Sequence, residues 1–264
     1  NVCFAEKRFK EAAVFFEKAV DLKYKDPESH YALALAYYKL DNIERFVEEC
    51  TTALVVDKRF ARAHYSIGFY YARIKKYDQA IKELAKAVEI SPADPEAHFL
   101  LTKLYLKKGK TSDAMRECVE TLKYDPRHIE AHFQQGLFAE QFADYATAVR
   151  EFIEVKRLMP EYKDIDHKLA QALQEEEEKC HNEIENNPKN STAYLTLADL
   201  YYEAGRLDLA AQLCEEVLVI DPKNIPARTN LGVIYASVSK YIKAIVEYKK
   251  ALLVDSNNQT VLDN

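Results

Sequence analysis

A 34-residue period runs through most of this chain of 264 residues. The tetrapeptide Glu-Ala-His-Phe occurs at 96–99 and again at 130–133. Four histidines, each followed by an aromatic residue, keep the same interval: His30, His64, His98 and His132. Self-similarity at a fixed interval of this length is typical of stacked supersecondary units, so it governs how every isolated motif is interpreted.

The period divides the chain into units when Ala61 is taken as place 1. Six complete units result: 27–60, 61–94, 95–128, 129–162, 191–224 and 225–258. Residues 1–26 form the end of an earlier, partial unit, and residues 259–264 begin a further helix. We therefore expect an N-terminal array over 1–162, an irregular segment over 163–190 and a C-terminal array over 191–264.

The first half of each unit carries the start and stop signals of a helix. Asp94, Pro95 and Glu96 supply an N-cap, a proline at the first helical position and an acid in the first turn. The helix is expected to run for about 14 residues to place 15. Gly109 and Gly205 occupy that place and can adopt the left-handed conformation that ends a helix.

A second helix is expected in each unit, for example over 78–90, where apolar residues keep helical spacing until Pro92. Gly68, Gly136 and Gly232 all occupy place 8, inside the first helix. A glycine there costs about 1 kcal/mol relative to alanine, so we expect the backbone of a neighbouring helix to approach closely. A single helical hairpin cannot bury its apolar face, so consecutive units must stack.

These positions resemble the signature of the tetratricopeptide repeat, which Gly68, Tyr71, Tyr77, Ala80, Ala87 and Pro92 match. The resemblance extends over most of the chain. It implies an all-α fold, a tetratricopeptide-repeat solenoid that forms a right-handed superhelix of antiparallel helix pairs. Such proteins are interaction scaffolds, but the fold serves many unrelated partners and identifies none of them.

The regular spacing of the four histidines suggests a metal-binding site, but the repeat favours a structural role for them. All four occupy place 4, where the family usually carries an aromatic residue packed inside the hairpin. Equivalent side chains on stacked helices lie about 8–10 Å apart, whereas zinc holds nitrogen ligands at about 2.0–2.1 Å. The pair His128 and His132 does not match the HExxH order of metalloproteases. We expect packed histidines, no metal and no other cofactor.

The cysteines also follow the period. Cys50, Cys118 and Cys214 occupy place 24, Cys180 precedes Cys214 by one full period, and Cys3 falls on another packing place. Free cysteine behaves as a small buried hydrophobe, and no CxxC spacing is present. We expect reduced core thiols and hence a cytoplasmic, reducing compartment.

Composition and motifs exclude several classes of function. A net charge of −6 and a pI near 5.7 argue against a nucleic-acid partner. No apolar run approaches the roughly 18 residues that span a bilayer, and no secretory signal follows Asn1. GxSxG, Walker-type and dinucleotide-binding motifs are absent. We expect no enzymatic activity, no membrane insertion and no nucleic-acid partner.

The resemblance also indicates a binding surface. In this family the first helices line a concave groove through places 2, 5, 9, 12 and 13, and partners bind there in extended or helical form. An aromatic residue at place 5 is common in the family and partly structural, whereas a large apolar residue at place 9 is less expected. We expect the partner-binding groove to contain Tyr31, Leu35, Tyr38, Lys39, Arg62, Tyr65, Phe69, Arg73, Phe99, Lys103, Lys107, Phe133 and Leu137.

Two known uses of the family can be tested by residue. The clamp for the C-terminal carboxylate of heat-shock proteins needs lysine and asparagine at places 5 and 9, and asparagine at place 6 of the next unit. This chain has Tyr31, Leu35 and Ser66 there, and the next pair of units also lacks the clamp. The asparagine ladder of O-linked sugar transferases at place 6 is reduced to Asn230.

The sequence therefore favours a non-catalytic scaffold or adaptor that binds a partner peptide or helix, with apolar anchors and acidic residues, in its groove. The alternative is a substrate-recruiting arm of a larger enzyme or multiprotein complex, since both ends fall inside repeat units. Self-association through these incomplete units is a third possibility.

The segment 163–190 is six residues short of a unit and has no turn residue across 174–179. It contains four lysines and eight acidic residues. We expect one continuous acidic helix over about 164–185, roughly 33 Å long at 1.5 Å per residue. Losing a turn should reorient the following units and bend the solenoid.

Overall fold

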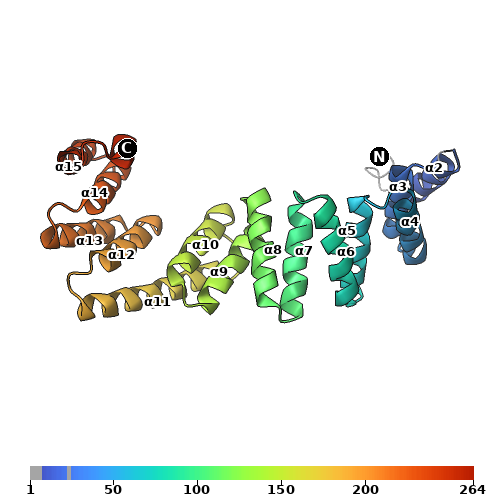
Figure 1. The fold of residues 1–264 in the computed structure, drawn as a ribbon, viewed down its shortest axis with the longest axis horizontal. Coiled ribbons are helices and arrows are strands. Elements are labelled where there is room, and N and C mark those ends of the chain that lie inside the picture. Colours follow the sequence, from blue (N-terminus) through green and yellow to red (C-terminus); the bar gives the residue numbers. More distant parts are fainter. Residues whose placement is uncertain (1–7, 23–24) are drawn as a thin grey trace. The chain divides into compact units, whose positions relative to one another are not determined.

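The computed structural model describes residues 8–22 and 25–264, and all regular structure in these ranges is helical (Figure 1). The expected all-α helix-pair architecture is confirmed. In chain order the helices are α2 (Phe9–Leu22), α3 (Pro27–Lys39), α4 (Ile43–Val56), α5 (Ala61–Arg73), α6 (Tyr77–Ile90), α7 (Pro95–Lys107), α8 (Thr111–Tyr124), α9 (Ile129–Gln141), α10 (Tyr145–Leu158), α11 (Ile165–Asn186), α12 (Ser191–Glu203), α13 (Leu207–Ile220), α14 (Ile225–Ser237), α15 (Tyr241–Val254) and α16 (Gln259–Leu262).

The helix boundaries follow the 34-residue period. The first helix of each complete unit begins at place 1 and has 13 residues, one fewer than expected: α3, α5, α7, α9, α12 and α14. The second helix begins at place 17 and has 14 residues: α4, α6, α8, α10, α13 and α15. Each unit is therefore the same helical hairpin.

Caps and turns explain why these helices begin and end where they do. The Asp94 carboxylate accepts a hydrogen bond from the backbone N–H of Ala97 at 3.2 Å, and Asp26 accepts one from Ser29 at the same distance. Such a cap stabilises a helix by about 1 kcal/mol. Gly109 and Gly205 have φ of 69° and 76°, the left-handed conformation expected at place 15. The other four units put non-glycine residues in this conformation, at Asp41, Lys75, Ala143 and Ser239.

The glycines at place 8 are explained by a side chain rather than by the close backbone contact that the sequence predicted. A Cβ added at Gly68 would lie 2.7 Å from Leu84 Cγ, although the Ala80 carbonyl oxygen is also near, at 3.2 Å. A Cβ at Gly136 or Gly232 would collide with the ring of Phe152 or Tyr248, respectively.

The side chains at places 8 and 24 are complementary in size in all six units. Glycine at place 8 accompanies a large residue at place 24, whereas alanine or threonine accompanies cysteine. The pairs are Ala34 with Cys50, Gly68 with Leu84, Thr102 with Cys118, Gly136 with Phe152, Ala198 with Cys214 and Gly232 with Tyr248. Close packing tolerates neither a void nor an overlap, so a larger residue at one of these places accompanies a smaller residue at the other.

The helices pack as two compact units, Asn1–Ala131 and His132–Asn264, each with its own core. In the first unit one cluster is centred on Leu33, Phe46 and Ile67, and another contains Leu84 and Leu101. In the second unit Leu197, Cys214 and Leu231 belong to one cluster. The division into arrays at 1–162 and 191–264 stays a prediction, as does a bend at the segment between them.

Helix α11 is a single helix of 22 residues across the segment that lacks a turn. This confirms the prediction of a continuous helix. Its buried positions include the apolar residues Ile165, Leu169, Ala172, Leu173 and Cys180, which keep helical spacing. It ends one full period before the end of α13, and Cys180 joins the core cluster of α12 and α13. The second half of α11 therefore takes the place of a second helix of a unit.

One of the acidic residues of α11 is buried in the core. Glu176 is only 2% exposed, and Lys179 Nζ lies 3.4 Å from its carboxylate.

Among the helices of residues 8–22 and 25–264, none is both long and apolar enough to cross a membrane.

Candidate functional site

Six of the expected groove residues line one pocket between α3 and α5. The pocket has a volume of about 230 Å³. Its lining consists of Tyr31, Leu35, Tyr38, Lys39, Phe46, Tyr65, Ser66 and Phe69. The period explains this convergence, because Tyr31 and Tyr65 share place 5, and Leu35 and Phe69 share place 9. We call this site the α3–α5 pocket.

Aromatic contacts fix the walls of the α3–α5 pocket. The rings of Tyr65 and Phe69 are stacked with centroids 6.4 Å apart, and Phe69 meets Tyr38 edge-on at 6.5 Å. Tyr38 in turn packs against the buried Phe46 at 5.1 Å. The Tyr31 hydroxyl hydrogen-bonds the Ser66 hydroxyl at 3.1 Å. Phe69 is 37% exposed, so its ring remains available to a partner.

Burial also raises the pKa of the two tyrosines at place 5. Desolvation raises the pKa of Tyr31 above its usual value, although the hydrogen bond with Ser66 partly opposes this. Desolvation likewise raises the pKa of Tyr65, with a smaller contribution from Glu96 and Asp94. Both phenols are therefore neutral at physiological pH and can donate a hydrogen bond.

Cations lie at the rim of the α3–α5 pocket. The Arg73 guanidinium lies 5.6 Å from the centre of the Tyr38 ring and donates a hydrogen bond to the Tyr38 hydroxyl. Arg62 lies over Tyr31 at 5.5 Å but forms an ion pair with Glu28. Within 8–22 and 25–264, no carboxylate lies within ion-pair distance of Arg73 or Lys39. Among the described residues, Arg73 and Lys39 therefore have no ion-pair partner.

The next groove residues form a less open surface. Phe99 is only 7% exposed, because the His128 ring lies 4.4 Å from it and Lys103 Nζ lies 4.5 Å above its face. Its ring therefore offers less surface than the sequence predicted. Lys103 and Lys107 are exposed.

Phe133 and Leu137 belong to the second packing unit, and both are half-buried. The Phe133 ring lies between Phe152 at 5.7 Å and Tyr162 at 5.0 Å. Part of this ring is therefore used in packing within its own unit. The role of these two residues in a groove stays a prediction.

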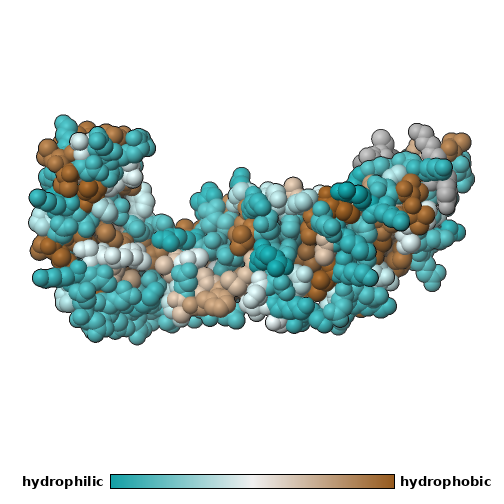
Figure 2. Space-filling view, viewed as in Figure 1, coloured by the Kyte–Doolittle hydropathy of each residue, from teal (hydrophilic) through white to brown (hydrophobic). Residues whose placement is uncertain are grey.

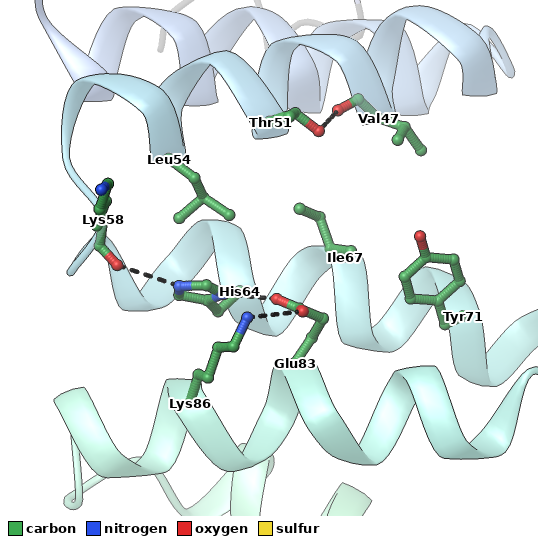
Figure 3. Close-up of a pocket in the computed structure, with 9 residues that line it drawn as sticks. All are labelled: Val47, Thr51, Leu54, Lys58, His64, Ile67, Tyr71, Glu83 and Lys86. Atoms are coloured by element: carbon green, nitrogen blue, oxygen red, sulfur yellow. Dashed lines mark hydrogen bonds and ion pairs between the residues drawn. The ribbon is translucent and has the colours of Figure 1, made fainter.

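A second pocket, which sequence reasoning missed, opens between α4, α5 and α6 (Figure 3). Its volume is about 500 Å³, and its lining is Val47, Thr51, Leu54, Lys58, His64, Ile67, Tyr71, Glu83 and Lys86. His64 and Lys86 both point toward Glu83, whose oxygens lie 2.6 Å from His64 Nδ1 and 3.0 Å from Lys86 Nζ. The carboxylate is thus already bound on both oxygens, so this pocket holds no free acid.

The histidines at place 4 belong to a repeated pair. Each lies with Nδ1 at 2.6–2.7 Å from a glutamate at place 23 of its own unit. The pairs are His30 with Glu49, His64 with Glu83, His98 with Glu117 and His132 with Glu151. The first three histidines are buried, as expected for packing roles, and the His132 side chain is 13% exposed. The signal in the sequence was the glutamate that recurs at place 23 of each unit with a histidine at place 4.

The side chain at place 4 lies between two hydrogen-bond acceptors, which suits a cation with two N–H donors. His98 Nδ1 lies 2.7 Å from Glu117 and its Nε2 lies 2.9 Å from the Pro92 carbonyl oxygen. A carboxylate and a carbonyl oxygen only accept, so an imidazolium ring, with a proton on each nitrogen, can donate to both. Arg228 occupies place 4 in unit 225–258 and donates to Glu247 at 2.8 Å and to the Pro222 carbonyl at 2.6 Å. Arginine thus makes the same two bonds.

Stability should therefore depend on the protonation of His98. Burial opposes its charged form, but the bonds to Glu117 and Pro92 outweigh burial and raise the pKa of His98 above its usual value of about 6.5. A raised pKa stabilises the fold fully below pH 6.5, and this contribution disappears as the pH rises through the folded-state pKa. The groups that face His98 are Glu117, Tyr124 and, at longer range, Glu120.

We expect the Tm of the wild type to fall as the pH rises above 6.5 through the pKa of folded His98, and His98→Arg to make this fall smaller. The variant keeps a cation at all pH values, as Arg228 does. NMR titration of the histidine ring protons measures the pKa of His98 directly. A value below the usual 6.5, or an unchanged fall of Tm in His98→Arg, would contradict the assignment.

The four cysteines of the described ranges are buried thiols, in agreement with their expected core positions. Burial raises the pKa of Cys50, Cys180 and Cys214 to about 12. Cys3 lies outside the described residues. No group of three or more His, Cys, Asp or Glu side chains suited to a metal ion occurs within 8–22 and 25–264.

Comparisons with known families agree with this repeat geometry. Models described as tetratricopeptide repeat match 75–136 and 183–229, 31–95, and 225–258, and a model described as TPR repeat matches 1–41. The chain belongs to the tetratricopeptide-repeat superfamily. Tetratricopeptide repeats are generally non-catalytic modules of protein interaction, and nothing in the described part of the chain indicates an enzyme. The stretch 137–182, which includes most of α11, lies outside these matches.

Individual relatives share only part of the chain. The uncharacterized protein ycf37 of Pyropia yezoensis is 35% identical over 79 residues, which are 30% of this chain and 44% of ycf37. Hsp70-Hsp90 organizing protein 1 of Glycine max is 31% identical over 80 residues, which are 30% of this chain and 14% of that protein. The chain therefore spans less than half the length of these relatives. A solved tetratricopeptide repeat protein of Parabacteroides merdae has 18% identity and a TM-score of 0.49, over 90% of this chain and 96% of its own.

Proposed function

We propose that this tetratricopeptide-repeat protein is a non-catalytic scaffold that binds a segment of a partner protein at the α3–α5 pocket. The observation that carries the proposal is the convergence of an exposed aromatic ring, Phe69, with two cations, Arg73 and Lys39, that have no ion-pair partner among the described residues. Rings supply apolar burial and cations supply orientation of an acidic partner.

The size of the α3–α5 pocket supports a protein segment over a small metabolite. Sites for drug-sized ligands usually have volumes of about 300–1,000 Å³ and enclose most of the ligand. The pocket measures about 230 Å³, which suits one large apolar side chain of a partner. A carboxylate next to that anchor would then face Arg73 or Lys39.

The wider groove would extend along the first helices of the following units. Lys103 and Lys107 on α7 are exposed and add further positive charge. Phe133 and Leu137 on α9 are the proposed continuation in unit 129–162. A longer partner with several acidic residues would also contact Lys103 and Lys107, whereas a short peptide needs only the α3–α5 pocket.

Selection from a displayed library of random 16-residue peptides tests this proposal without knowledge of the natural partner. Peptides selected on the wild type are counter-selected on Phe69→Ala/Arg73→Glu. We expect enrichment of peptides with one large apolar residue close to an acidic residue. If no peptide discriminates the wild type from this variant, the working surface is elsewhere.

A further inference from the structure

The outer surface of α15 differs from that of every other second helix. At places 18 and 22 unit 225–258 has Ile242 and Val246, which are 82% and 43% exposed. The other five units have only polar residues or alanine there: Glu44 and Glu48, Asp78 and Lys82, Ser112 and Arg116, Ala146 and Arg150, Asp208 and Gln212. The repeat itself therefore serves as an internal control, and large apolar side chains at these places are not required by the fold.

Ile242, Val246 and Leu253 share one face of α15, on which Lys249 lies between Val246 and Leu253. We call the three apolar residues the α15 strip. With 3.6 residues per turn, the three side chains lie within roughly 40° of one another around the helix and span about 16 Å along it. Leu253 is 86% exposed. Figure 2 shows hydrophobic surface at the part of the molecule formed by α15.

Stacking of a further repeat would not cover the α15 strip. The residues of a second helix that pack toward the next unit are at places 17 and 21, as Tyr77 and Ile81 do in the cluster with Leu101 and Leu104. In α15 these places hold Tyr241 and Ile245. The α15 strip lies on the neighbouring, outward side, so its exposure needs another explanation.

The charges around the α15 strip have one sign. Lys240, Lys243, Lys249 and Lys250 are all exposed. Glu247 is the one acid of α15 and is only 8% exposed, because Arg228 at 2.8 Å and Lys250 at 2.6 Å bind it. The α15 strip therefore consists of apolar residues bordered by cations. The packing unit as a whole is acidic, because residues 132–264 contain 14 Lys and Arg and 22 Asp and Glu.

This combination selects among possible occupants. Pairing with α15 of a second copy would oppose lysines to lysines and is disfavoured. An extended anionic lipid surface would also face the acidic remainder of the unit. A single partner helix on α15 interacts electrostatically mainly with charges within about one Debye length, roughly 10 Å. These charges are mainly the lysines of α15.

We propose that the α15 strip is a second docking surface, which binds an acidic amphipathic helix of a partner protein. The partner helix would place apolar residues at intervals of about four and seven against Ile242, Val246 and Leu253. Its flanking glutamates or aspartates would face the lysines. This surface consists of other residues than the α3–α5 pocket.

The test uses the same random 16-residue library, with Ile242→Asp/Val246→Gln as the counter-selection variant. This variant takes the residues that unit 191–224 has at the same places, so the helix is expected to fold normally. We expect enriched peptides that are acidic and amphipathic, with a Kd at least about 10-fold weaker for the variant. Lys243→Glu/Lys249→Glu should weaken the same peptides while leaving the apolar strip intact.

Two controls separate this surface from the proposed groove. Val55→Gln removes one exposed apolar side chain from the outer side of α4 and should leave binding unchanged. Phe69→Ala/Arg73→Glu should also leave it unchanged, even if the α3–α5 pocket proves to have no ligand. Loss of binding in the latter variant would overturn the assignment to α15.

Four other outcomes would also overturn it. The enriched peptides could be neutral or basic, or none could discriminate the variant. The wild type could bind phosphatidylserine vesicles through α15 in place of any peptide. It could also form a dimer that Ile242→Asp/Val246→Gln dissociates.

Discussion

The double variant Phe69→Ala/Arg73→Glu should weaken binding of a groove-selected peptide by more than about 100-fold, because truncation of one hot-spot ring costs about 2 kcal/mol or more and the reversed charge repels an acidic partner. Phe69 is 37% exposed and Arg73 lies at the rim, so helical content and Tm should change little. Isothermal titration and circular dichroism measure the two effects separately.

A matched control for this variant is Val119→Ala/Lys123→Glu on α8. It changes an exposed apolar residue and a lysine at the same spacing of four, in the same packing unit. We expect unchanged affinity. If Phe69→Ala/Arg73→Glu binds as tightly as the wild type, the α3–α5 pocket is not the site. If it unfolds, Phe69 is part of the core.

The second large effect concerns the size match between places 8 and 24. Gly136→Ala puts a Cβ into the ring of Phe152 and should destabilise the protein by about 1–3 kcal/mol. Phe152→Cys leaves a cavity at a fully buried side chain and should cost about 3 kcal/mol or more. The combination Gly136→Ala/Phe152→Cys recreates the pair Ala198 and Cys214, so it should be less destabilised than the sum of the single changes.

Urea unfolding of the four proteins gives the coupling energy, which we expect to be about 1–3 kcal/mol in favour of the double variant. Gly136→Ala combined with Leu84→Cys serves as the mismatched control, because Leu84 packs on Gly68. This control should be additive. Additivity in the matched pair would mean that the hairpin relaxes around either residue and that size complementarity has no role.

The fold could be predicted from the sequence because the period determines most of it. The places of glycine, proline and alanine indicated a helix pair per unit, and α7 and α6 begin within a residue of their expected positions. The absence of a turn residue across 174–179 indicated the continuous helix α11. These are local signals, which depend on backbone preference and helical spacing.

Contacts between places were harder to predict, because they depend on how two helices face each other. A glutamate at place 23 accompanies each repeated histidine, but only the hairpin geometry brings His98 and Glu117 together. In the same way, the sequence gives no sign that His128 covers Phe99 while Phe69 stays open. The period therefore indicated six residues that line the α3–α5 pocket, but the exposure of each ring could not be predicted from it.

Photo-cross-linking tests the central claim most directly. A benzoylphenylalanine at position 35, on the lining of the α3–α5 pocket, is compared with one at position 55, on the outer side of α4. With a groove-selected peptide, we expect a cross-link from position 35 that excess unlabelled peptide abolishes, and none from position 55. A cross-link from position 55 alone, or equal labelling from both positions, would contradict a partner-binding site at the α3–α5 pocket.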